Sequence, residues 1–196
     1  LVLTTVPGGS ALSDFRAAAL LRRLREVVPG IEGVTARYLH LVGSTAELDE
    51  ATAGRVRELL TYGEPAVEDT TGSAAVVLVA PRLGTISPWA SKATDIAHNC
   101  GLEMERVERV TEYRLATAEP LTDEQWLACA AVLHDRMTQS VLVSADDLAG
   151  LFAEREGAAM ERVDIAGRGR EALVEANAAW GLALSEDEVD YLVEAF

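Results

Sequence analysis

The chain has 196 residues, a length that accommodates one ordinary domain and a smaller second one. With 49% hydrophobic and 25% charged residues it is not predicted to be disordered, and no apolar run approaches the roughly 20 residues that a membrane span needs. Seventeen basic against 32 acidic residues give a formal charge of −15, which disfavours nucleic acids and anionic membranes as partners.

The two cysteines, Cys100 and Cys129, lie far apart and form no CxxC motif. Their spacing therefore indicates neither a disulfide framework nor a zinc site. Together with the composition, this predicts a soluble protein of the reducing cytoplasm.

Apolar and alternating runs bounded by turn residues predict five β-strands. The first is expected to end at Pro7, and helices with apolar residues at helical spacing are predicted between the strands. In the last of these helices, the inward stripe is predicted to be Trp126, Cys129, Ala130, Leu133 and Met137. The strands are expected at residues 1–6, 33–42, 74–80, 106–117 and 140–143, and the helices at 13–28, 46–62, 87–99 and 122–136.

The order strand, helix, strand, helix occurs twice, with corresponding elements offset by roughly 75 residues. This indicates an α+β fold made of two similar halves that share an antiparallel sheet. Chance is the alternative explanation, because strands and helices commonly alternate and the halves show no convincing sequence identity.

The remaining residues predict a helical region. An acidic helix is expected at 144–156 and a joint at 157–159, followed by a strand-like run at 160–165. Gly181 ends the next helix, at 170–180, and Ser185 and Glu188 cap the last one. Its apolar stripe of Val189, Leu192, Val193 and Phe196 has no stop signal. This is typical either of a chain that continues or of a terminal helix that packs on its own domain. The predicted domains are 1–143, a connection at 144–160, and 161–196.

The segment LGTISPWASKATDIAHNCGL, residues 83–102, has only Lys92 and Asp95 as formal charges. Ser87 and Pro88 form a strong helix start, and Gly101 a strong stop. Two faces are predicted for this helix. The apolar face holds Trp89, Ala93, Ile96 and Cys100, and the polar face holds Ser91, Lys92, Asp95, His98 and Asn99. The polar face is either an ordinary surface stripe or a surface that recognises another domain. Its low charge favours recognition of another domain.

Residues 84–102, GTISPWASKATDIAHNCGL, resemble the signature near the amino terminus of the large single-chain phosphoribosylformylglycinamidine synthase, the purine-pathway amidotransferase often called PurL. Leu83 and Ala90 depart from residues common in that family. Further similar stretches lie at 11–16, 59–63, 121–126, 133–137 and 181–192, so the resemblance covers essentially the whole chain.

The resemblance implies a PurS-like domain and the start of a helical linker domain, which in this family precede a synthetase core and a glutaminase domain. The full enzyme is expected to hydrolyse glutamine, pass ammonia internally and use Mg-ATP to convert formylglycinamide ribonucleotide to its amidine. Its catalytic, cofactor and metal residues are expected after Phe196, so none is assigned in this chain. The implied partners are the synthetase and glutaminase domains of the same chain.

We expect this chain to contact those domains through the 85–99 segment. Lys92, close to the Ser87 helix start, is a further candidate for attracting an anion. A stand-alone acidic module that binds a partner through the same surface is the alternative. The predicted interface residues are Arg82, Ser87, Trp89, Lys92, Thr94, Asp95, His98 and Asn99.

Three other motifs carry little weight. The GxGxxA pattern at 167–172 suggests dinucleotide binding, but two glycines before a helix are more often a turn. Ser91, Asp95 and His98 suggest a hydrolase triad, although rigid neighbours on one helix seldom reach that geometry. His98 and Cys100 lack further metal ligands. His40 is interpreted as ordinary strand packing.

Overall fold

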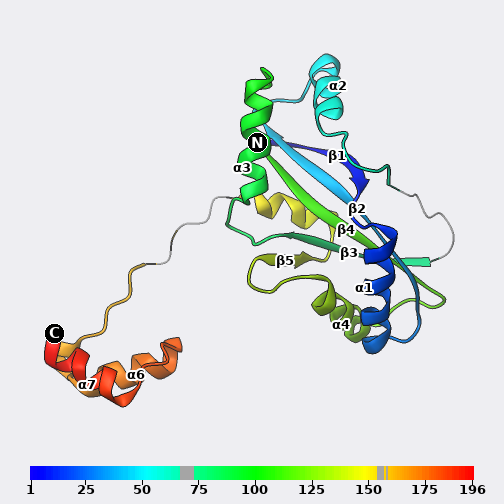
Figure 1. Ribbon diagram of the computed structural model, residues 1–196. Coiled ribbons are helices and arrows are strands. Elements are labelled where there is room, and N and C mark those ends of the chain that lie inside the picture. Colours follow the sequence, from blue (N-terminus) through cyan, green and yellow to red (C-terminus); the bar gives the residue numbers. More distant parts are fainter. Residues whose placement is uncertain (67–72, 154–156, 158) are drawn as a thin grey trace. The chain divides into compact units, whose positions relative to one another are not determined.

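The computed structural model describes residues 1–66, 73–153, 157 and 159–196 (Figure 1). The chain forms two compact units, residues 1–155 and 156–196. The assignment of the first unit to a PurS-like domain and of the second to a linker domain stays a prediction. Among the described residues, no helix is both long and apolar enough to cross a membrane.

The first unit is an α+β fold built on one antiparallel sheet of five strands, which confirms the predicted class (Figure 1). Across the sheet the strands follow the order β1-β2-β4-β3-β5. The strands are β1 (Val2–Ser10), β2 (Ile31–Ser44), β3 (Ser73–Pro81), β4 (Arg106–Thr117) and β5 (Gln139–Leu142), and the helices are α1 (Asp14–Val27), α2 (Glu50–Leu59), α3 (Pro88–Asn99), α4 (Asp123–Leu133) and the 3₁₀ helix η1 (Ala145–Leu151).

The two predicted halves, β1-α1-β2-α2 and β3-α3-β4-α4, are both present. The longest strands, β2 and β4, pair at the centre of the sheet, from Ile31 opposite Thr117 to Gly43 opposite Arg106. Exchanging β1 with β3 and β2 with β4 leaves the order β1-β2-β4-β3 the same when it is read from the other edge. The topology therefore has the symmetry expected of a duplicated unit.

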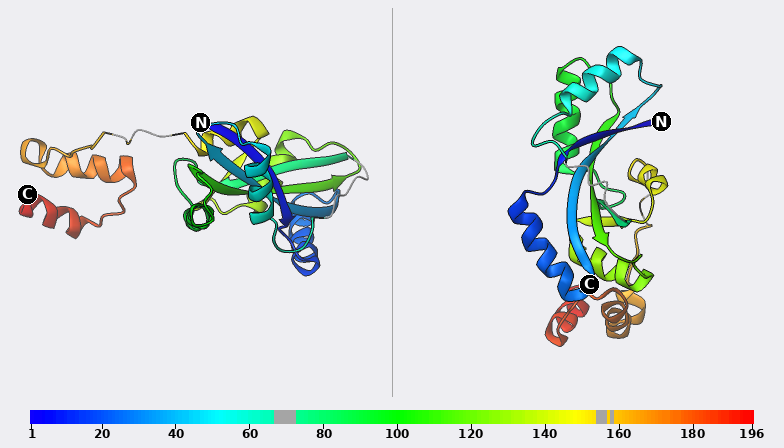
Figure 2. Two further views of the ribbon diagram at one scale, coloured as in Figure 1. Left: turned by 90° about the horizontal axis from the view of Figure 1, so that it is seen from above. Right: turned by 90° about the vertical axis from the view of Figure 1, so that its right-hand side faces the viewer.

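Alternation along the strands separates two faces of the sheet. On one face, α1 and α4 cover a core that includes Val34 and Leu115, while α2 and α3 cover a second core around Val42 and Val107. On the opposite face, η1 packs against the strands through Leu148 and other apolar residues (Figure 2). The helix-bearing face is thus divided between two helix pairs.

The first strand is longer than predicted. β1 continues through Pro7, Gly8 and Gly9 to Ser10, with an irregular register between Pro7 and Ser10. A proline is tolerated there because β1 is an edge strand, where a missing N–H need not interrupt a ladder on both sides.

Three other expectations were wrong in detail. The predicted helix at 144–156 is a 3₁₀ helix over its described part, ending at Leu151. Residues 160–164 form no strand, and Ile165 begins a short helix instead. Met137 is 81% exposed, because α4 ends at Leu133 and His134 is already extended.

The second unit consists of α5 (Ile165–Arg168), α6 (Arg170–Trp180) and α7 (Glu186–Ala195). Gly181 ends α6 in the left-handed conformation, and Ser185 with Glu188 forms the predicted capping box of α7. The Asn177 side chain bonds both backbone groups of Leu184, which fixes the turn between the two helices. Buried residues of this unit are Ala172, Leu173, Ala176 and Val189.

Candidate functional site

Helix α3 begins and ends where the sequence predicts. The Ser87 hydroxyl accepts a hydrogen bond from the Ala90 N–H at 2.9 Å, and Pro88 occupies the first helical position. Gly101, at a φ of 69°, turns the chain after Cys100. Because a left-handed residue follows the helix, the chain can return at once into the loop that leads to β4.

The buried face of α3 differs from the predicted one. Ala90 and Ala97 are buried, and the Thr94 hydroxyl accepts a hydrogen bond from the Val107 N–H of β4 at 2.9 Å. These small side chains let the helix lie close to the sheet. As a result two residues of the predicted apolar face, Ile96 and Cys100, are exposed, Ile96 to 44%.

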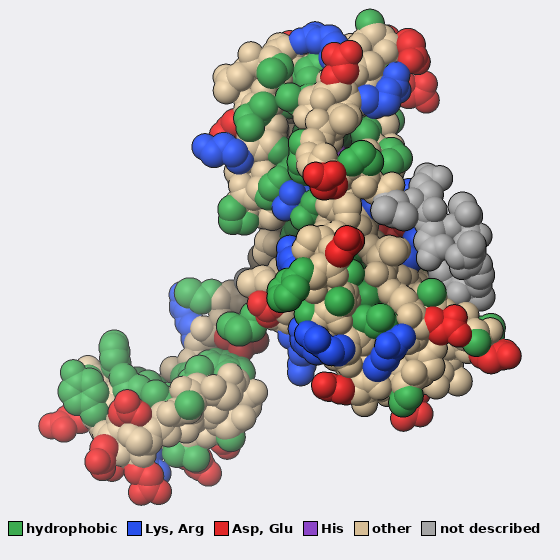
Figure 3. Space-filling model, turned by 45° about the vertical axis from the view of Figure 1, so that its right-hand side comes forward, with side chains coloured by type: hydrophobic (Ala, Val, Ile, Leu, Met, Phe, Trp, Pro, Cys, Tyr) green, Lys and Arg blue, Asp and Glu red, His purple; other side chains and the backbone are tan. Residues whose placement is uncertain are grey.

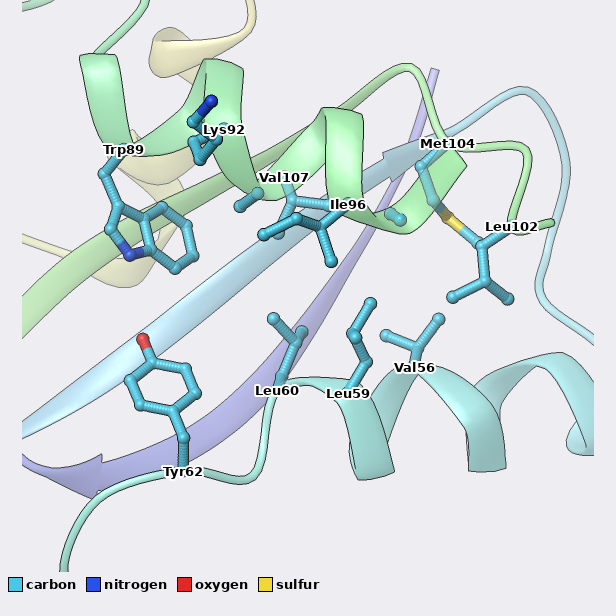
Figure 4. Close-up of a pocket in the computed structure, with 12 residues that line it drawn as sticks. Val56, Leu59, Leu60, Tyr62, Trp89, Lys92, Ile96, Leu102, Met104 and Val107 are labelled. Atoms are coloured by element: carbon cyan, nitrogen blue, oxygen red, sulfur yellow. The ribbon is translucent and has the colours of Figure 1, made fainter. Parts of the chain in front are cut away.

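Ile96 lines a groove of about 290 Å³ between α2 and α3 (Figure 4). Leu102 and Met104 lie at one end of the groove, and Tyr62 and Trp89 at the other. Hydrophobic side chains reach the surface over this part of the unit (Figure 3). The remaining lining residues are Val56, Leu59, Leu60, Lys92, Ala93, Ile96, Ala97 and Val107.

A polar and aromatic cluster adjoins the Trp89 end of the groove. The Arg109 guanidinium lies over the rings of Tyr38 and Trp89, at 4.2 and 4.7 Å from their centroids. It also donates a hydrogen bond from Nη1 to the Tyr62 hydroxyl at 3.2 Å. Cation–π contacts to two rings hold this guanidinium in one place.

His40, fully buried, lies directly opposite Arg109 in the β2–β4 pair. Its Nε2 is 2.8 Å from the Tyr62 hydroxyl. Since Arg109 can only donate, the Tyr62 hydroxyl accepts from Arg109, while the direction of its bond with His40 Nε2 depends on the tautomer of the histidine. Burial, together with the positive charge of Arg109, lowers the pKa of His40 from 6.5 to about 4.

The start of α3 is held by a fully buried carboxylate, that of Glu108 in β4. Its oxygens accept hydrogen bonds from the Ser87 hydroxyl at 2.7 Å and from the Arg109 backbone N–H at 2.9 Å. Arg106 adds an ion pair at 2.6 Å. Glu108 thus places negative charge at the positive end of the helix dipole. The attraction of an anion by Lys92 stays a prediction.

A comparison with known protein families shows the family of the chain. Residues 37–152, more than half of its length, match the family described as "Formylglycinamide ribonucleotide amidotransferase N-terminal". The chain belongs to this family. The resemblance to a purine-biosynthesis amidotransferase is confirmed, and the matched residues include the groove between α2 and α3, the Arg109 cluster and all of the predicted interface residues.

The predicted interface residues fall into two groups. Ser87 and Thr94 form the internal hydrogen bonds described above, Trp89 packs on Arg109, and His98 Nε2 donates to the Met104 carbonyl at 2.7 Å. The others are exposed, and their side chains make no hydrogen bond to the described residues. These are Arg82, Lys92, Asp95 and Asn99. That these eight residues contact other domains of the amidotransferase stays a prediction.

Sequence reasoning missed the Arg109 cluster. His40 was interpreted as ordinary packing, and neither Tyr38 nor Arg109 was considered. The only signal in the sequence is polar and aromatic residues alternating with aliphatic ones in two strands. Which residues of the two strands meet depends on the register of the sheet, and alternation within each strand does not reveal it.

The rejected motifs have ordinary structural explanations. Gly167 lies inside α5, where its N–H is bonded by Asp164, and Gly169 at a φ of 63° separates α5 from α6. This is a break between helices and not a strand-to-helix phosphate turn. The Ser91 hydroxyl bonds the Ser87 carbonyl, so it is not paired with His98. Among the described residues no three His, Cys, Asp or Glu side chains converge on a metal position.

Replacing Glu108 by Gln tests its role in holding α3. We expect the free energy of unfolding to fall by about 3 kcal/mol, because Arg106 keeps its charge in a largely buried position without its carboxylate partner. Urea unfolding measures the change. Glu105→Gln, at an exposed position just before β4, is the matched control and should change stability by less than about 0.5 kcal/mol. Equal stability of the two variants would contradict the assignment.

The lowered pKa of His40 predicts a stability that depends on pH. In the unfolded chain the histidine takes up a proton below about pH 6.5, whereas in the folded chain it does so only below about pH 4. Folding therefore becomes less favourable as the pH falls from about 6.5 to about 4. Between about pH 7 and pH 5, the wild type should lose about 2 kcal/mol more than a His40→Gln variant. Urea unfolding at both pH values measures this, and parallel pH profiles would refute it.

Proposed function

We propose that this chain is the non-catalytic amino-terminal part of a formylglycinamide ribonucleotide amidotransferase, and that it organises the synthetase and glutaminase domains of the same chain. In this proposal those domains hold Mg-ATP and carry out glutamine hydrolysis, ammonia transfer and amidine formation. Membership of the amino-terminal family supports the proposal. The observation that carries the organising role is the open apolar groove between α2 and α3.

The groove has the composition of a protein-binding surface. Its walls are aliphatic and aromatic, and Ile96 extends from α3 toward α2 at 44% exposure (Figure 4). Around it the exposed side chains of Lys92, Asp95 and Asn99 supply donors and acceptors. An apolar centre with a polar rim is the usual anatomy of an interface, and exposed apolar surface of this kind is costly to leave uncovered.

The occupant that we assign to the groove is an apolar segment of the remaining domains of the amidotransferase. A match to the amino-terminal part of an amidotransferase supports this choice, because the other domains of a multidomain enzyme are tethered nearby at high effective concentration. An apolar side chain inserted beside Ile96 would bury surface on both partners, at a gain of roughly 25 cal/mol per Å².

An Ile96→Asp variant tests this assignment. The purified chain is titrated against separately expressed synthetase and glutaminase portions, while binding and glutamine-dependent amidine formation are both followed. We expect binding to weaken at least about tenfold, because a carboxylate in the groove would be desolvated without a partner. Leu127→Asp is the matched control, since Leu127 is 62% exposed on α4, away from the groove.

Binding by the wild type and binding by Ile96→Asp test different parts of the proposal. Wild-type binding that Ile96→Asp leaves unchanged would remove the groove from the interface. A folded wild-type chain that binds neither portion would overturn the organising role and favour the stand-alone acidic module.

A further inference from the structure

A second depression, of about 380 Å³, lies between the start of α1 and the start of α3. It opens on the helix-bearing face of the sheet, where the two helix pairs leave the centre uncovered. Two arginines, Arg16 of α1 and Arg109 of β4, line it together with the polar or aromatic side chains of Tyr38, Trp89, Thr111 and Tyr113. We call this depression the arginine hollow.

Arg109 has no carboxylate partner among the described residues, and this sets it apart from the other arginines of the sheet. Arg37 and Arg114 both pair with Glu112, and Arg106 pairs with Glu108. Arg109 is held instead by two aromatic rings and one hydroxyl.

The free donors of Arg109 are accessible. A guanidinium has five N–H groups, and within the described part of the chain the Tyr62 hydroxyl takes one from Arg109. None of its nitrogens is among the buried polar atoms that lack a partner. Among the described residues its other nitrogens therefore have no partner and are not fully buried, and two rings already hold the guanidinium, so a ligand would not have to order this side chain.

Among the described residues that line the hollow, the charged groups are two arginines and one carboxylate, although the chain as a whole is acidic. The nearest carboxylate that lines it, Glu108, is fully buried and engaged by Ser87, Arg106 and a backbone N–H. Most charges that make up the net charge of −15 lie far from the hollow, and at 0.1 M salt screens charges that are more than about 10 Å apart. Contact with an anionic group is therefore governed by Arg16 and Arg109.

The hollow and the groove adjoin each other. Trp89 lines both depressions, and Tyr62, which lines the groove, bonds Arg109 in the hollow. We propose that the arginine hollow receives an acidic side chain, Asp or Glu, from the same protein segment whose apolar side chains occupy the groove between α2 and α3. A carboxylate matches the planar fork of a guanidinium. The inference rests on the proposed function, of which it specifies the partner chemistry.

The test uses the titration against the synthetase and glutaminase portions with four arginine variants. Arg109→Gln should weaken binding at least about tenfold, and Arg109→Lys by less, since a lysine keeps the charge but loses the fork. Arg16→Gln should weaken binding severalfold. Arg22→Gln, an exposed position of α1 that does not line the hollow, changes the net charge equally and should bind as the wild type does.

Salt provides the second readout. Raising the salt concentration should weaken wild-type binding more than binding of Arg109→Gln, because the variant lacks the charge pair that salt screens. Circular dichroism establishes that each variant is folded.

The outcomes separate this inference from the proposed function. If the wild type binds and folded Arg109→Gln binds equally well, the acidic contact is wrong while the organising role stands. If Arg109→Gln fails to fold, undiminished binding by Arg16→Gln overturns the inference instead. If the wild type itself does not bind, the proposed function fails and the inference fails with it.

Discussion

The pairing of β2 with β4 is the contact on which the rest of the first unit depends. It joins the two strand-helix-strand halves through their longest strands, whose partners are far apart in the sequence. Closing such long loops costs chain entropy, which the shared sheet and the cores on its faces must offset. The same register brings His40 opposite Arg109, so the central pairing also assembles the polar cluster.

In this duplicated unit the helices leave part of one face of the sheet uncovered. Each helix pair, α1 with α4 and α2 with α3, packs over one half of the sheet. The centre of that face is covered by neither pair, and Tyr38, His40 and Arg109 take the place of aliphatic side chains there. The hollow is thus a consequence of the symmetric arrangement, and polar and aromatic residues line it where a simple core would have aliphatic ones.

Three specific contacts connect helix α3 to the sheet. Glu108 fixes its first turn, Thr94 bonds the β4 backbone, and Trp89 stacks beside Arg109. A helix held at three points by specific contacts cannot rotate freely to bury its larger apolar residues. This accounts for the exposure of Ile96 and for the groove that it forms with α2.

The sequence by itself determined the class of fold, most of the helices and strands, and the family. Alternation, helical spacing and strong caps such as Ser87-Pro88 and Ser185-Glu188 are local, so they can be interpreted without knowing what packs on them. Predictions failed where tertiary packing overrides local preference: at the edge strand beyond Pro7, at the 3₁₀ helix η1, and at Met137 after the early end of α4. Only the tertiary structure decided which face of α3 is buried and which residues meet Arg109, because both depend on the register of the β2–β4 pair and on how closely alanines let a helix approach the sheet.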